Sequence, residues 1–129
     1  MRFMMLMIPK DYGQAGAAAR PTAEAVAAMT KFNAEMIKAG VMLTGEGLHP
    51  PAAGVRIAFG GGQPKVTDGP FAEAKELIGG YWMIQARSKE EAVEWARRCP
   101  AAAGDVIEIR QIFEMDDFPP DVRAAIHPA

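Results

Sequence analysis

The segments RFMMLMI (residues 2–8) and YWMIQA (residues 81–86) decide the fold, because both carry apolar side chains at odd and at even positions. The side chains of a β-strand point alternately to its two faces. A strand that is apolar on both faces is normally covered on both sides. We therefore predict that these two segments are the central strands of a sheet.

Amphipathic and turn patterns place the other elements around these strands. A helix is predicted over residues 23–39, since apolar side chains recur there at helical spacing after the N-cap residue Thr22, and Gly40 ends it. A second helix follows the capping-box sequence at residues 88–91 and stops at Pro100. The remaining predicted strands are residues 41–48 and 106–115 and the two arms of a hairpin with a glycine-rich turn, 55–59 and 65–67.

This order of elements predicts an α+β fold, a ferredoxin-like βαββαβ unit with an inserted β-hairpin. Two helices cover only one face of such a sheet, so the other face of a monomer would expose Met and Ile side chains. We therefore expect a homodimer in which two sheets pack face to face. Residues 1–115 are predicted to form a single domain, and residues 116–129, with two adjacent acids and two adjacent prolines, a C-terminal tail.

The composition excludes several classes of function. Fourteen Lys and Arg against sixteen Asp and Glu give a net charge of −2, which offers no electrostatic footprint for nucleic acid or an anionic membrane. The single cysteine, Cys99, excludes an intramolecular disulfide framework, and no metal-ligand spacing, phosphate-binding loop or nucleophile elbow is present. We expect a cytoplasmic protein that binds neither nucleic acid nor membranes and uses no metal or cofactor.

The stretch VTDGPFAEAKELIGGYWMI (residues 66–84) resembles the signature of the DGPF-type branch of the YCII-related proteins, and its DGPF tetrad (residues 68–71) is intact. The resemblance extends over residues 1–115. It implies the dimeric α/β-barrel form of the ferredoxin-like fold. For some YCII-like relatives it also implies enzymatic activity, with a His and Asp pair suggested for acid/base chemistry. DGPF-type proteins often accompany extracytoplasmic-function sigma factors.

Two residues are candidates for acid/base catalysis. Asp68 stands at the mouth of a turn beside the sheet, where a carboxylate could move a proton. Alternatively, its oxygens cap the backbone amides of Phe71 or Ala72. His49 follows a predicted strand and could reach the rim of the sheet to act with Asp68 or Glu46 as a neutral base. The alternative for His49 is a solvent-exposed loop position.

Six further residues are candidates for ligand binding: Tyr81, Glu108, Arg110, Phe71, Glu73 and Asn33. Those on the core strands form either a Glu/Arg network across the dimer or a polar pocket floor for an anionic or phenolic ligand. Phe71 would plug the core, whereas Glu73 either lines the site or belongs to a solvated face. Asn33 lies in an apolar helix stripe, so its amide needs a hydrogen-bond partner.

Three functions follow from these candidates. The first is a homodimer that binds a small molecule between sheet, helix and DGPF turn and catalyses proton transfer or elimination without a cofactor, with Asp68 as acid/base and His49 as its helper. The second is a non-catalytic regulatory or interaction module linked to an extracytoplasmic-function sigma factor. The third is a cofactor-free monooxygenase, as in other dimeric α/β barrels, with a cavity lined by Trp82 and Trp95.

Overall fold

A four-stranded antiparallel sheet organises the computed structural model, which describes residues 1–10, 22–69 and 77–126. Predictions on Phe71, Glu73 and a short helix at residues 71–76 lie outside these residues. The strand order is β2-β5-β1-β6. The four strands are β1 (Arg2–Ile8), β2 (Met42–Gly47), β5 (Gly80–Gln85) and β6 (Val106–Gln111). As predicted, the two segments that are apolar on both faces, β1 and β5, take the central places.

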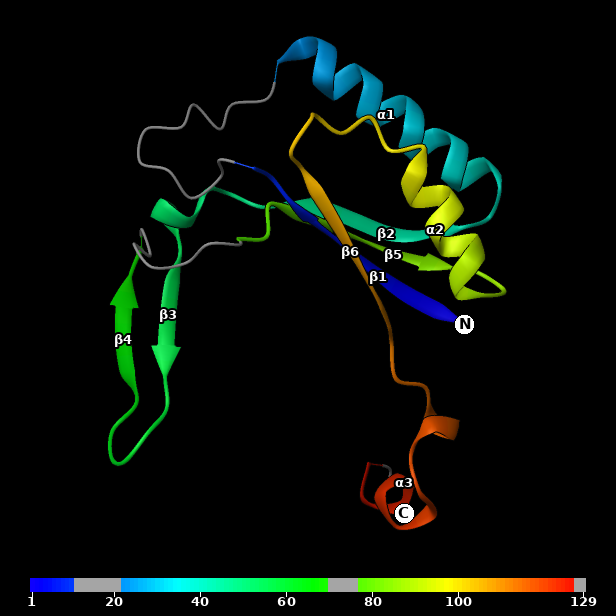
Figure 1. Cartoon of the computed structure of the whole chain (residues 1–129). Helices are drawn as coiled ribbons and strands as arrows, with labels where there is room; N and C mark the ends of the chain where they lie inside the picture. The colour runs from blue at the N-terminus through cyan, green and yellow to red at the C-terminus, as the bar shows by residue number, and fades with distance from the viewer. Residues whose placement is uncertain (11–21, 70–76, 127–129) are drawn as a thin grey trace.

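Two helices, α1 (Ala23–Lys38) and α2 (Lys89–Arg97), cover one face of this sheet (Figure 1). The element order and topology confirm the ferredoxin-like α+β fold. The hydrophobic core lies between the helices and the sheet. Its buried members come from both layers: Phe3, Met5, Phe32, Met36, Val41, Trp82, Ile84, Ala86 and Ala92.

Both helices begin at the predicted caps. The Thr22 hydroxyl accepts a hydrogen bond from the Ala25 amide, and the Ser88 hydroxyl accepts one from the Glu91 amide. The predicted capping box is only half formed, because the Glu91 carboxylate accepts its hydrogen bonds from Arg87 instead of the Ser88 amide. The charged guanidinium of Arg87, 2.9 Å away, is a stronger partner than a neutral amide.

The structure corrects two predictions. β6 was expected to continue to residue 115, but it ends at Gln111. The Ile112 amide still donates to the Arg2 carbonyl, but β1 begins at Arg2 and offers no further partner. Phe113 therefore leaves the sheet and is 70% exposed. In α1, the helical spacing of apolar residues predicts an apolar stripe that includes Val26 and Ile37, but both side chains are exposed.

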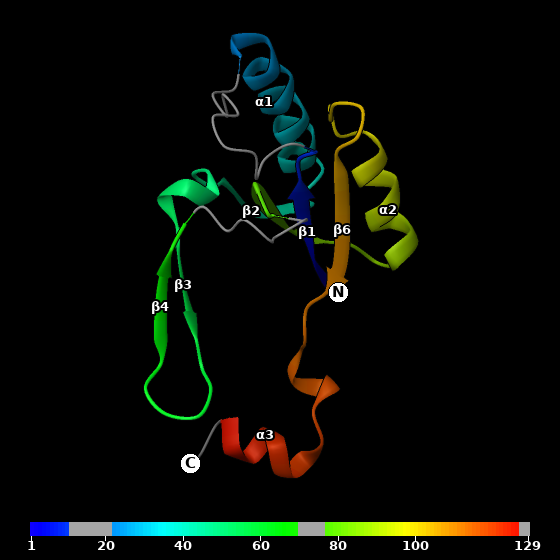
Figure 2. The ribbon, with the colours of Figure 1, turned by 60° about the vertical axis from the view of Figure 1, so that its left-hand side comes forward.

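Two segments extend from the sheet on the side opposite the helices, as both ribbon views show (Figures 1 and 2). One is the predicted hairpin, β3 (Val55–Ala58) and β4 (Lys65–Asp68), preceded by the 3₁₀ turn Pro51–Ala53. The other is the C-terminal arm, residues 112–126, which contains the 3₁₀ turn Met115–Asp117 and helix α3 (Pro120–Ile126). The Arg2 guanidinium anchors this arm to β1 through both carboxylate oxygens of Glu114, at 2.8 and 3.1 Å.

Candidate functional site

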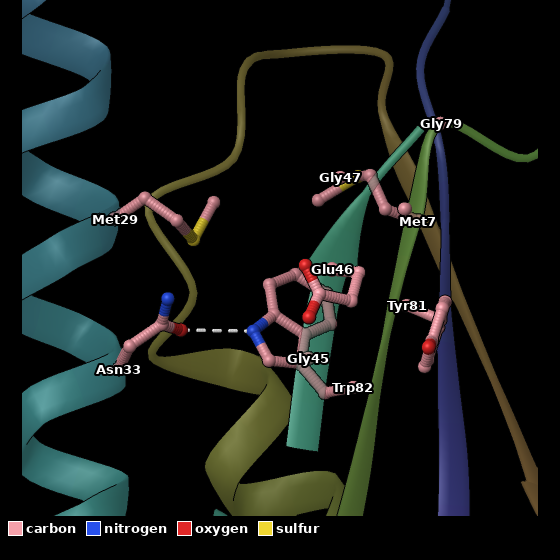
Figure 3. Close-up of a pocket in the computed structure, with 10 residues that line it drawn as sticks. Met7, Met29, Asn33, Gly45, Glu46, Gly47, Gly79, Tyr81 and Trp82 are labelled. Atoms are coloured by element: carbon pink, nitrogen blue, oxygen red, sulfur yellow. Dashed lines mark hydrogen bonds between the residues drawn. The ribbon is translucent and has the colours of Figure 1, made fainter. Parts of the chain in front are cut away.

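A cavity of about 230 Å³ lies between α1 and the β2–β5 edge of the sheet (Figure 3). Its walls combine apolar side chains with backbone. The lining residues are Met7, Met29, Asn33, Gly45, Glu46, Gly47, Gly79, Gly80, Tyr81 and Trp82. Three predicted candidates, Asn33, Tyr81 and Trp82, belong to this set, and Glu46 is its charged member.

Glycines allow close packing beside the cavity. A Cβ at Gly45 would lie 2.9 Å from Cδ1 of Trp82 and 2.7 Å from Cε of Met42, and one at Gly80 would lie 3.0 Å from the Glu46 carbonyl oxygen. The missing side chains thus let the indole of Trp82 and the backbones of β2 and β5 approach closely, and the glycines contribute only backbone to the cavity lining. Sequence reasoning missed these residues, although glycines inside a strand pattern are a signal for such a close approach.

A hydrogen bond between helix and strand fixes the apolar wall of the cavity. The Trp82 indole Nε1–H donates to Oδ1 of Asn33 at 2.9 Å (Figure 3). The ring of Phe32 meets the same indole edge-on, with centroids 6.0 Å apart. The Asn33 amide thus has the partner that its place in an apolar stripe requires. Because this hydrogen bond uses the carbonyl oxygen of Asn33, the NH₂ group of the same side chain, which lies on the side of Met29, can donate a hydrogen bond to a ligand.

The strand residues predicted to bind ligand lie together on the open face of the sheet, which we define as the face opposite α1 and α2. Strand alternation places Tyr81 on the opposite side of β5 from Trp82. Tyr81 and Glu108 flank Leu6 in adjacent strands, and Arg110 pairs with Met4. The structure therefore separates these three side chains from Asn33 by the thickness of the sheet.

A second cavity, of about 200 Å³, lies at the base of the β3–β4 hairpin. Its lining residues are His49, Pro50, Pro51, Ala53, Gly54, Leu77 and Ile78. Asp68 pairs with Val55 beside this cavity, and the next residue, Gly69, donates its amide to the Gly54 carbonyl at 2.9 Å. The structure thus brings the two predicted acid/base residues, His49 and Asp68, to the base of one hairpin, where both are exposed.

The two cavities are neighbours, because each is lined by residues from the same two chain segments, 45–49 and 77–82. Residues 45–47 line the first cavity and His49 the second, while residues 79–82 line the first and residues 77–78 the second. The Leu48 amide donates to the Gly79 carbonyl at 2.9 Å, and the Gly79 amide donates to the Met7 carbonyl at 2.8 Å. These bonds hold the junction between the cavities to the central strand.

Other catalytic classes find no support in the part of the chain that the structure describes. Burial raises the pKa of the Cys99 thiol to about 11, so it is protonated at neutral pH, the opposite of what a cysteine nucleophile needs. Residues 1–10, 22–69 and 77–126 contain no cluster of three His, Cys, Asp or Glu side chains suited to a metal ion. No helix among them is long and apolar enough to cross a membrane.

Comparison with known proteins identifies relatives of this chain. The family model for the YCII-related domain matches residues 1–116. An uncharacterized protein of Rhizobium meliloti (strain 1021) is 40% identical to the chain over 50 residues. This match covers 39% of the chain and 40% of that protein, so it spans less than half of the relative's length.

Proposed function

The chain belongs to the YCII-related domain family, and we propose that within it the protein is a homodimer that binds a small molecule in the α1–β2–β5 cavity and transfers a proton without a cofactor. The observation that carries this proposal is the fixed Asn33–Trp82 pair above a floor of bare glycine backbone. Such a site combines a rigid apolar wall with an oriented hydrogen-bond donor, the usual features of a small-molecule pocket.

The lining residues favour a small ligand with a flat apolar part and a hydrogen-bond acceptor. The indole of Trp82, with Met7 and Met29, suits an aromatic or other planar group. The NH₂ group of Asn33 suits a hydroxyl or carbonyl oxygen. Phenolic compounds fulfil both requirements. The volume of about 230 Å³ allows a single ring and little more.

Asp68 and His49 are the proposed acid/base pair. The junction at Leu48 and Gly79 puts the cavity that His49 lines next to the binding cavity, so a substituent on a ring seated against Trp82 would extend toward the hairpin base. The carboxylate of Asp68 accepts a proton from the ligand, and Asp68 or His49 returns it to a neighbouring atom. No other reactant is required.

The homodimer is supported by the open face of the sheet. Met4, Leu6, Tyr81 and Met83 form its centre and are half-buried in the single chain, with neither helix above them. Glu108 and Arg110 lie on the neighbouring strand at its margin. An apolar centre with a polar rim is typical of a protein–protein interface.

The Asn33→Asp variant tests the binding site. Aspartate keeps an oxygen that accepts the Trp82 hydrogen bond, but it replaces the NH₂ donor by an acceptor. We expect the fold to persist and the affinity for small phenols, measured by quenching of Trp fluorescence, to fall at least about tenfold, the cost of one lost hydrogen bond.

Ala34→Asp is the matched control, because Ala34 is exposed, neighbours Asn33 and does not line the cavity. It adds the same charge and should leave binding unchanged. Equal affinities of the wild type and Asn33→Asp, or a wild type that binds no member of the phenol panel, would show that this cavity is not the site.

A regulatory module linked to an extracytoplasmic-function sigma factor is the alternative function, and the exposed apolar side chains of the hairpin favour it. It predicts a complex with such a sigma factor and no small-molecule binding. The monooxygenase alternative has less support, since Trp82 lines the cavity whereas Trp95 packs against the core and under the guanidinium of Arg98, 4.5 Å from the ring centroid.

A further inference from the structure

Glu46 is the charged residue of the α1–β2–β5 cavity, and the proposed proton transfer does not use it. It lies in β2, the edge strand of the sheet, where it pairs with Tyr81 of β5. An edge strand has no neighbour beyond it, so a long side chain there has room to turn around the edge. Figure 3 shows the carboxylate of Glu46 turned toward Trp82 and away from Tyr81. The described residues that line the cavity thus include one carboxylate and no Lys, Arg or His.

The carboxylate of Glu46 has no partner in the part of the chain that the structure describes. The ion pairs there use other carboxylates: Glu91, Glu94, Glu114 and Asp116. No side-chain hydrogen bond reaches Glu46 from those residues either. Its neighbours in β2 are Gly45 and Gly47, and a Cβ added at Gly47 would meet no atom within 4 Å. The carboxylate is therefore free to bind a ligand, and there is open space beside it.

A lone carboxylate in a cavity lining discriminates between ligands by their charge. A protonated amine would gain a charge-assisted hydrogen bond to Glu46. An anionic ligand would meet a like charge, and no cation among the described lining residues compensates for it. Specificity of this kind combines an attraction for one ligand with a repulsion of its competitor. The lining therefore favours a cationic ligand over a neutral one, and a neutral ligand over an anionic one.

We propose that Glu46 determines the charge of the ligand, and that the cavity binds a phenol that carries a protonated amine on a short chain. This inference rests on the cavity being the ligand site proposed above. Asn33 comes from α1 and Glu46 from β2, so two polar groups face the ligand from different walls (Figure 3). The NH₂ group of Asn33 donates to the phenolic oxygen, and the carboxylate of Glu46 accepts from the ammonium group. The aromatic ring contacts Trp82.

The exposure of Glu46 sets the size of the expected preference. A carboxylate at the rim stays in contact with water, so neither it nor the ammonium group has to lose its full hydration. The same water weakens the attraction, and an exposed ion pair changes an affinity by about fivefold at most. Salt screens such a pair further. We therefore expect a preference of about fivefold for the amine at low ionic strength, and a smaller one as salt is added.

Glu46→Gln tests the inference with three phenols of similar size: tyramine, para-propylphenol and para-hydroxyphenylacetate. Titrated by Trp fluorescence at low ionic strength, the wild type should bind the cation about fivefold more tightly than the neutral phenol, and the anion more weakly still. Glutamine keeps the size of the side chain without its charge. In Glu46→Gln the three affinities should converge on that of para-propylphenol. Glu35→Gln is the matched control and should keep the wild-type order, because Glu35 is an exposed carboxylate on α1 that does not line the cavity.

An NMR measurement on the wild type keeps the inference falsifiable if Glu46→Gln fails to fold. The resonance of the Glu46 carboxyl carbon should move on addition of tyramine and stay in place on addition of para-propylphenol. Equal movement with both, equal affinities of the wild type for all three phenols, or an unchanged preference in Glu46→Gln would overturn the inference and leave the ligand site standing. A wild type that binds none of the three would overturn the ligand site and this inference with it.

Discussion

The amide of Asn33 links the cavity side of α1 to the sheet. Its carbonyl oxygen holds the indole of Trp82, a residue 49 positions further along the chain. The helical pattern alone predicts that an amide inside an apolar stripe needs a partner. It cannot say which one, because that depends on how the helix crosses the sheet. The same bond fixes the indole as a wall and turns the NH₂ group toward the cavity, so one residue serves packing and binding.

Asp68 is the residue whose substitution separates a structural from a chemical role. Asp68→Asn keeps the size of the side chain and one acceptor oxygen but cannot take up a proton. If Asp68 only caps the following turn, the free energy of unfolding should fall by up to about 1 kcal/mol. As the acid/base, it should barely affect stability, whereas exchange of a carbon-bound ligand proton, ortho to a phenolic hydroxyl, with deuterated solvent should slow roughly 100-fold.

The exchange is measured by NMR on a phenol that binds, with Asp121→Asn as control, since Asp121 is an exposed carboxylate in α3. We expect the wild-type rate in Asp121→Asn and the slower rate in Asp68→Asn. The same rate in all three proteins would contradict the catalytic role and favour the interaction module.

At the scale of elements, the sequence pattern predicted the helix ends, because these depend on hydrogen bonds and backbone angles of nearby residues. The caps Thr22 and Ser88 start their helices because each hydroxyl accepts an amide of the first turn. Gly40 ends α1 with φ of 73°, a conformation that favours glycine. The end of β6 was not predictable from its own residues, since it depends on where β1 starts. The cavity floor was missed for a similar reason, because Gly45 and Gly80 become a floor only once β2 and β5 are paired.

The ion pair between Arg2 and Glu114 makes the attachment of the C-terminal arm dependent on pH. The hydrogen bond from the guanidinium lowers the pKa of Glu114 below its usual value. A carboxyl with a depressed pKa stabilises the folded state above its unfolded pKa and loses that effect as the pH falls through the folded pKa. The arm should therefore loosen in acid and stay anchored at neutral pH.

The chemical shift of the Arg2 Nε–H proton reports this anchor, because a hydrogen bond to a carboxylate moves a guanidinium proton downfield. We expect the downfield shift at neutral pH and a return toward the value of free arginine on acidification. In Glu114→Gln the shift should stay close to the free value at every pH, since no carboxylate remains. Glu108→Gln, which removes an exposed carboxylate on β6 four residues before the arm, is the control and should behave as the wild type. A downfield shift that persists in Glu114→Gln would show that the pair does not anchor the arm.

For the whole molecule, the proposed homodimer is inferred from β1 and β5, whose side chains are apolar on both faces of the sheet. It predicts a central pair of strands with both faces covered, and the structure places α1 and α2 over one face. The directions of the hairpin and the C-terminal arm could not be predicted. They depend on the strand ends from which these segments leave, and both leave toward the open face. A single copy thus covers one face of its sheet with the two helices and leaves apolar side chains exposed on the opposite side.

Leu6→Asp and Met83→Asp test whether a partner covers the open face. Leu6 stands between Tyr81 and Glu108, and Met83 pairs with Met4, so both side chains point away from the helix-covered core. A charge there should leave the protomer folded but would be buried without a partner in the dimer. We expect the dimer Kd to rise at least about 100-fold, roughly 3 kcal/mol. Ile37→Asp, at an exposed apolar position on α1, should assemble normally. Light scattering with circular dichroism distinguishes a folded monomer from an unfolded chain, and normal assembly of both open-face variants would show that this face is not the interface.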